Sequence, residues 1–170
     1  DMVFTLDLPN ILLIIAGVMN FLLGVLIYIK RRESVANQLY TLNIVAIIWW
    51  IVSMVIYRTT GDYLLFWTII LYVNHTFIAS SFFYFSFFFP SGGPKYPRVV
   101  LFIISIVNTM VALITVIPGF IIRDTTIVSG GEPIISFGPW YPLYAVYITT
   151  FFLLGIVVLY FKYARGDNKI

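Results

Sequence analysis

The sequence has no cysteine and only one histidine, His75. The lack of cysteine excludes disulfides, thiolate zinc sites, iron–sulfur clusters and cysteine nucleophiles. A single histidine cannot supply both axial ligands of a bis-histidine haem, or the histidine clusters of membrane di-iron enzymes. We therefore expect no metal site, no cofactor and no catalytic residue in this chain.

Charged residues are also scarce. They make up 10% of the 170 residues, whereas 61% are hydrophobic and the mean hydropathy is +1.01; a soluble domain usually has about 25% charged residues. All seven acidic residues fall at the ends of the long apolar stretches or between them. This distribution argues against a proton pump, an ion-coupled carrier or an intramembrane Ser-His-Asp enzyme, because each needs ionisable groups at depth.

Five apolar stretches are long enough to cross a bilayer, whose hydrocarbon core of about 30 Å takes about 20 helical residues. They predict helices over 8–29, 39–57, 63–89, 99–117 and 143–161. The expected fold class is all-α: a polytopic membrane protein with a bundle of five transmembrane helices. These helices form one domain, 1–170, and they are expected to contact the lipid bilayer. Because the chain starts at Asp1 and stops abruptly at Ile170, we expect it to be a segment of a longer protein.

One connection, 118–142, is long. β-Branched residues lie on both sides of a Ser-Gly-Gly-Glu turn at 129–132. This pattern predicts a β-hairpin between the fourth and fifth helices. An unstructured loop is the alternative.

Lysine and arginine are divided unequally between the two sides of the predicted membrane. Eight of the ten lie with the 30–38 loop, the 90–98 loop and the C-terminus, whereas Arg58 and Arg123 lie on the other side. Cationic loops stay on the cytoplasmic side during insertion. We therefore expect a plasma-membrane protein with its N-terminus and hairpin outside and its C-terminus inside. The net charge of +3 reflects this topology and gives no case for nucleic-acid binding.

Several polar side chains fall inside the predicted helices. An unpaired amide in hydrocarbon is costly, so these groups should face other helices. The candidate interhelical polar network consists of Asn20, Asn43, Asn74, His75 and Asn108. A hydrated polar pocket at mid-depth is the alternative. His75 has two alternative interpretations: it senses the external pH, or it is a neutral histidine hydrogen-bonded between helices.

Aromatic side chains gather toward the predicted outer ends of the helices, where amphipathic rings are favoured. The candidate contacts for a ligand or another stimulus are Trp50, Trp67, Trp140 and Tyr144. Ordinary packing is the alternative for each of them.

Several of these features together resemble a known family, the N-terminal seven-helix sensor region of bacterial and archaeal histidine kinases. The features are a basic loop before Asn37, the pair Trp49 and Trp50, Trp67 at the start of the third helix, Phe88-Phe89-Pro90 at its end, the stretch 138–144, and Arg165-Gly166-Asp167-Asn168-Lys169. The resemblance implies that kinase activity resides in a later cytoplasmic domain and that no catalytic residue lies in these helices. That family has seven helices, whereas this sequence predicts its first five.

The leading hypothesis is a transmembrane input module that detects an extracytoplasmic or membrane-embedded stimulus and transmits it through the fifth helix to a kinase-type output domain. The stimulus would be a small molecule, a lipid or a peptide, and a homodimer is compatible with the pattern. A structural or assembly subunit of a membrane complex is the alternative from another class, since it too needs polar interhelical faces and no catalytic groups. A part of a transporter is a third, weakened by the missing ionisable residues and broken helix pairs.

Overall fold

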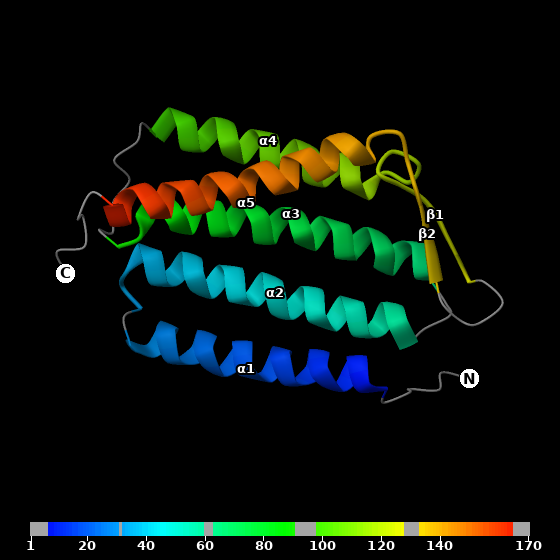
Figure 1. The fold of residues 1–170 in the computed structure, drawn as a ribbon, viewed down its shortest axis with the longest axis horizontal. Coiled ribbons are helices and arrows are strands. Elements are labelled where there is room, and N and C mark those ends of the chain that lie inside the picture. The colour runs from blue at the N-terminus through cyan, green and yellow to red at the C-terminus, as the bar shows by residue number, and fades with distance from the viewer. Residues whose placement is uncertain (1–6, 31, 60–62, 91–97, 128–132, 165–170) are drawn as a thin grey trace.

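The computed structural model of the chain describes residues 7–30, 32–59, 63–90, 98–127 and 133–164. These residues form five helices and two strands (Figure 1): α1 Leu8–Lys30, α2 Val35–Thr59, α3 Leu64–Phe88, α4 Arg98–Val116, β1 Ile122–Ile127, β2 Pro133–Phe137 and α5 Tyr141–Ala164. All five helices have the length and the apolar composition needed to cross a membrane. The prediction of five long apolar helices is confirmed, and the fold is mostly helical.

Two helices extend well beyond their apolar stretches, which is why their predicted bounds were too narrow. At the start of α2, the Gln38 backbone N–H donates to the Ser34 carbonyl at 3.0 Å, so the helix already includes the polar residues Asn37 and Gln38 before its long apolar stretch. Pro142 lies in the first turn of α5, where a missing N–H costs a helix little. The observed and predicted ranges are Val35–Thr59 against 39–57 for α2 and Tyr141–Ala164 against 143–161 for α5.

The central helix of the bundle is α3. Half of its most apolar stretch is buried by protein, against 6% for α1 and 6% for α4. It packs against α2, α4 and α5, while α1 packs against α2 at the edge of the bundle. The polar contacts that join several helices should therefore converge on α3.

The strands β1 and β2 pair antiparallel and lie across one end of the helices (Figure 1). The predicted hairpin is thus present, although its predicted turn at 129–132 falls outside the described residues. Ile121 and Ile122 are both buried, with 2% and 0% of their surface exposed. Ile121 directly precedes β1 and Ile122 is its first residue; the strand register then shifts between Ile122 and Asp124, as at a β-bulge. The hairpin is therefore fixed to the helices at its root.

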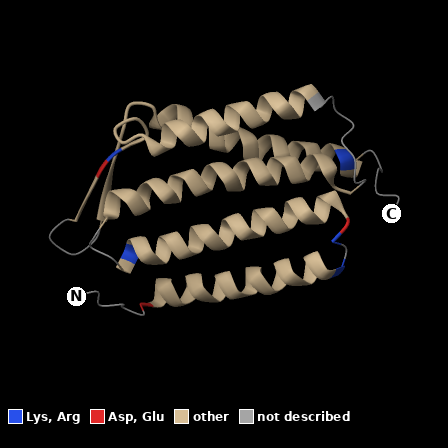
Figure 2. Ribbon diagram, turned by 180° about the vertical axis from the view of Figure 1, so that it is seen from behind, with Lys and Arg blue, Asp and Glu red and all other residues tan. Residues whose placement is uncertain are grey.

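Charged side chains of the described residues lie at the two ends of the bundle, and the helices between those ends carry none (Figure 2). We call the end that holds Asp7, Arg58 and the hairpin the hairpin end. The opposite end, which holds Lys30 and Lys162, is called the basic end. Helices α1, α3 and α5 begin at the hairpin end and finish at the basic end (Figure 1).

A polar cluster at the hairpin end joins the start of α1 to the end of α2. The Asp7 carboxylate accepts a hydrogen bond from the Asn10 backbone N–H at 3.0 Å and one from the Arg58 guanidinium at 2.8 Å. Arg58 also donates to the side-chain oxygen of Asn10 at 3.2 Å. The Asn10 N–H and then Arg58 hold the pKa of Asp7 below its ordinary value of 3.8. The cluster stabilises the fold when Asp7 is ionised.

Close contact between α1 and α2 depends on Gly24. A Cβ at this position would lie 2.9 Å from Cγ2 of Ile44, which is too close for two carbon atoms. Ile44 is buried, and its branched side chain has little rotamer freedom in a helix. Two turns away on the same helix, a Cβ at Gly17 would lie at an ordinary 3.5 Å from Ile51.

The Asp7 cluster predicts a pH dependence of stability. Because the pKa of Asp7 is lower in the folded state, its stabilisation is complete above about pH 4 and is lost as the pH falls through the folded-state value. Asp7→Asn removes this titration. Its melting temperature in detergent should therefore fall less between about pH 5 and pH 3 than that of the parent protein. Asp124→Asn, at an exposed aspartate of β1, is the control, and equal pH slopes for the parent and Asp7→Asn would refute the contribution.

The two glycines of α1 form a matched pair. Gly24→Ala forces a methyl group against Ile44 and should lower the free energy of unfolding by about 1 to 3 kcal/mol, the usual cost of overpacking. Gly17→Ala has room for the methyl group and gains helix propensity, so it should be neutral or slightly stabilising. Thermal or denaturant unfolding in one detergent measures both. Equal losses in the two variants would contradict the close approach at Gly24.

Candidate functional site

A cluster of aromatic rings lies at the hairpin end, where α3, β2 and the start of α5 meet. Its centre is Tyr72 of α3, whose ring centroid lies 5.7 Å from Tyr144, 6.0 Å from Phe137 and 6.3 Å from Tyr141. Phe137 and Tyr141 stack with centroids 3.8 Å apart. The rings join α3 to β2 and α5, two elements that lie far from α3 in the sequence. We call these four residues the aromatic cluster.

The start of α5 is held in place by its backbone and by Tyr144. Gly138 lies so close to the carbonyl oxygens of Gly119 and Phe120 that no Cβ could be accommodated there. Its N–H donates to the Ile121 carbonyl at 2.9 Å. One turn into α5, the buried Tyr144 donates its hydroxyl to the Tyr72 carbonyl at 2.6 Å. Hairpin root, α3 and α5 are therefore connected through short hydrogen bonds.

A cavity of about 320 Å³ lies beside the aromatic cluster, between α3 and α5. Its walls include Tyr72, His75, Tyr141, Tyr144, Ala145 and Thr149. On α5 these residues recur with the spacing of one helix face, and on α3 the two residues are three apart. Thr149 is exposed, so the cavity reaches the surface of the bundle within the membrane-spanning length of α5.

The cavity is suited to an uncharged guest. The sequences of α3 and α5 contain no aspartate or glutamate that could balance a cation. A charge at the centre of a membrane costs about 2.5 to 3.5 kcal/mol on insertion scales, and more in simulations. Cation–π attraction offsets only about 0.5 to 2 kcal/mol of that. The tyrosine rings and hydroxyls therefore suit a neutral molecule better than a cation.

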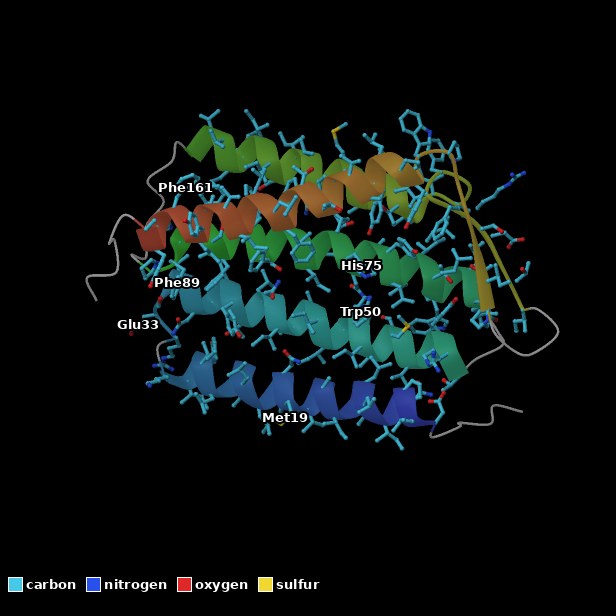
Figure 3. The ribbon with its side chains drawn as sticks, in the orientation of Figure 1. Met19, Glu33, Trp50, His75, Phe89 and Phe161 are labelled. Atoms are coloured by element: carbon cyan, nitrogen blue, oxygen red, sulfur yellow. The ribbon has the colours of Figure 1, made fainter. Side chains whose placement is uncertain are left out.

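His75 and Trp50 meet behind this cavity. Figure 3 shows the two side chains between α3 and α2, and their ring centroids lie 5.6 Å apart in an edge-to-face arrangement. The Trp50 Nε1–H is buried, and it has no hydrogen-bond partner in the described part of the chain. His75 also contacts the ring of Tyr72 at 5.7 Å. His75 therefore lies between the cavity and a tryptophan with an unused donor.

The four candidate stimulus contacts do not form one site. Tyr144 belongs to the aromatic cluster, and Trp50 reaches the cavity only through His75. Trp67 packs against the ring of Phe66 and against the core cluster of Tyr57, Leu64 and Leu71, which Trp50 also contacts, and it does not line the cavity. Trp140 is 51% exposed at the turn that leads into α5.

The candidate polar residues form separate contacts across different helix pairs. Asn43 of α2 donates to the Ser81 hydroxyl at 2.8 Å and to the Ile78 carbonyl at 3.0 Å, both on α3. Asn74 of α3 donates to Ser53 of α2 at 3.4 Å. These bonds join α2 to α3 at two depths.

Asn108, Asn20 and His75, the other members of the predicted polar network, each make a different kind of contact. Asn108 of α4 accepts a hydrogen bond from the Tyr147 hydroxyl of α5 at 2.7 Å. Asn20 donates at 2.8 Å to the carbonyl of Ala16, so its bond stays within α1 instead of crossing to another helix. His75 makes ring contacts with Trp50 and does not join the asparagines. The five residues thus do not form one continuous network.

Lys162 is the main polar contact at the basic end. Its ammonium group donates to three carbonyl oxygens at the end of α3, those of Ser86 at 2.9 Å, Phe87 at 2.5 Å and Phe89 at 2.7 Å. The last carbonyls of a helix have no partner within the helix, and a cation there is favourable to the helix dipole. Lys162 therefore fastens α5 to the end of α3.

Sequence reasoning missed Tyr72 and Lys162. Lys162 counted only as a topology signal, because a sequence does not show which helix end a lysine reaches. For Tyr72 there was a signal, its spacing of three from His75, which matches the spacing of Tyr141 and Tyr144 on α5. Two such pairs on neighbouring helices indicate a shared face.

A second groove, of about 600 Å³, runs along α2 and α3 on the side of Phe21. Its walls are almost entirely apolar, with Asn74 and two serines at the α3 side. Such a surface on membrane-spanning helices suits lipid acyl chains. Among the residues that the structure describes, there is no group of three or more histidines, aspartates or glutamates that could hold a metal.

Comparison with known proteins gives one match. The model of a family described as the N-terminal 7TM region of histidine kinase matches residues 12–170. No match was found among curated proteins or among solved structures. The match covers all five helices and the hairpin, except for the first turn of α1.

Substitutions of two asparagines test how much the hydrogen bonds between α2 and α3 contribute to the free energy of unfolding. Asn43→Ala removes two bonds to α3, so the free energy of unfolding should fall by about 0.6 to 2 kcal/mol, the range for polar contacts between membrane helices. Asn20→Ala removes a bond within one helix only and should change it by less than about 0.5 kcal/mol. Unfolding in detergent measures both. A loss at Asn20 as large as that at Asn43 would contradict the structural assignment.

Proposed function

Because the chain belongs to the family of N-terminal 7TM regions of histidine kinases, we propose that it is the sensory input module of a membrane-bound signalling protein. The stimulus acts at the hairpin end, and the response leaves through the basic end of α5. The segment itself is not an enzyme. Its output is a histidine-kinase domain in the cytoplasm.

The orientation in this proposal places the hairpin end outside the cell. Its support is the distribution of lysine and arginine, eight on the side of the basic end and two on the side of the hairpin end. Four of those eight, Arg31, Lys95, Arg165 and Lys169, fall outside the described residues. The positive-inside rule then places the N-terminus outside and the C-terminus inside.

The hairpin is the element best placed to detect a stimulus from outside. It touches α3 through a hydrogen bond from the Thr125 hydroxyl to the Thr68 hydroxyl at 3.2 Å. Its second strand receives a long bond of 3.5 Å from the Tyr57 hydroxyl of α2 to the Pro133 carbonyl. Its root packs with the buried Tyr144 of α5. A change at the hairpin therefore reaches three helices directly.

Helices α3 and α5 carry that change across the membrane. They are joined by Tyr144 at the hairpin end and by Lys162 at the basic end. This double connection is the observation that carries the proposal, because a shift of one helix at the outer end must be matched at the inner end. A ligand shifts the populations of two helix arrangements only if it binds them with different affinity. The hairpin and the aromatic cluster are where that difference arises.

These 170 residues contain no cysteine, so a crosslinking test needs only two introduced cysteines in this region. Thr68→Cys with Thr125→Cys replaces hydroxyls 3.2 Å apart, a separation that a disulfide can bridge. Locking the hairpin onto α3 fixes one arrangement, so oxidation should change autophosphorylation of the full-length protein in liposomes by about threefold or more, and reductant should reverse it. The direction of the change reports whether the seated hairpin is the active state.

Each single-cysteine variant is the control for oxidation itself and should keep the parent rate. Gel mobility with and without reductant verifies that the crosslink has formed. Equal autophosphorylation in the locked and reduced double variant would contradict the role of the hairpin. A full-length protein without autophosphorylation would overturn the kinase output.

A further inference from the structure

The cavity beside the aromatic cluster has unused hydrogen-bonding groups on its walls. In the part of the chain that the structure describes, the hydroxyls of Tyr72, Tyr141 and Thr149 make no hydrogen bond, although all three residues line the cavity. Most other threonines within the helices bond a carbonyl of the preceding turn, as Thr68 does to Leu64 at 2.8 Å. Polar groups at membrane depth are expected to find a partner. The cavity thus offers donors to a guest.

The residues that line the cavity favour a planar guest. Three of them are tyrosines and a fourth is His75, and aromatic rings pack best against other rings, offset or edge to face. A volume of about 320 Å³ accommodates one or two fused rings but not a peptide. The lack of acidic residues in α3 and α5 disfavours a cation.

The route into the cavity is also visible. Thr149, one of the residues that line the cavity, is exposed on α5 at membrane depth, eight residues from the start of that helix. A molecule dissolved in the hydrocarbon would reach it laterally, without passing the hairpin.

We propose that this cavity binds an uncharged, planar aromatic molecule with carbonyl oxygens, of the quinone type, which enters from the bilayer between α3 and α5. The tyrosine and threonine hydroxyls donate to its carbonyl groups, and the rings of Tyr72 and Tyr144 pack against its ring system. The inference rests on the proposed function, because it names the ligand class that this sensory module would detect.

The test is binding of menadione, a two-ring quinone without a charged group, to the purified chain in phosphatidylcholine nanodiscs. Trp50 contacts the imidazole that lines the cavity, so bound quinone should quench tryptophan fluorescence in a saturable manner. Ala145→Phe fills the cavity and should weaken this saturable binding at least tenfold. Val146→Phe, one residue on and 61% exposed, is the matched control and should bind as the parent does.

Two further measurements keep the proposal falsifiable. If Ala145→Phe does not fold, Thr149→Phe blocks the mouth from an exposed position and should weaken binding to the same extent. Two analogues test the ligand class: 2-methylnaphthalene, which lacks the oxygens, and benzyltrimethylammonium, which carries a charge. Each should displace menadione, measured as recovered tryptophan fluorescence, with an inhibition constant at least ten times the dissociation constant of menadione. Equal quenching in the parent and both cavity variants, or equal competition by either analogue, would overturn the inference.

The experiments can refute the ligand site and the sensory function independently of each other. If menadione binds but leaves autophosphorylation of the full-length protein unchanged, the ligand site stands and its sensory role is refuted. If menadione does not bind while the Thr68–Thr125 crosslink still changes autophosphorylation, the sensory module stands and the ligand class is wrong.

Discussion

Hydrogen bonds from the side chains of one helix to the carbonyls and side chains of its neighbours hold this bundle in its arrangement, because hydrocarbon offers a polar group no other partner. Apolar contact alone is a weak guide, since lipid tails are as apolar as leucine. The polar groups converge on α3, which bonds α2 through Asn43 and Asn74 and bonds α5 through Tyr144 and Lys162. That helix is accordingly the most buried. The edge helix α1 has a glycine contact and one capped end instead.

The two ends of the bundle use different chemistry to join the same pair of helices. At the hairpin end α3 and α5 meet through aromatic rings and a hydroxyl, beside a cavity. Toward the basic end they meet through phenylalanine rings such as those of Phe83 and Phe151, and through the Lys162 ammonium group on three carbonyls. The three bonds of Lys162 keep the ends of α3 and α5 together, so the two helices are coupled at this end as well. The rings at the hairpin end line a cavity, so a guest in that cavity would touch α3 and α5 at once.

The sequence predicted the helices well and the site only in part, for one physical reason. Crossing hydrocarbon requires a continuous apolar stretch, so each helix is visible locally, and its ends blur only where polar turns such as that at Gln38 continue the helix. Which residues meet depends on helix rotation, which local composition does not fix. Asn20 and Asn43 look alike in sequence, yet one bonds its own helix and the other bonds α3. Trp67 and Tyr144 both lie near the hairpin end, but only Tyr144 faces the cavity.

The register shift at the root of β1 has a mechanical consequence. Because two consecutive isoleucines are buried there, the ribbon is clamped at its base, while most strand residues beyond that point are exposed or half-buried. Farther along the ribbon, hydrogen bonds from Thr125 to Thr68 and from Tyr57 to Pro133 hold it against α3 and α2. Its base packs with Tyr144 of α5. The exposed residues of the hairpin can therefore vary while the contact between its root and α5 stays the same.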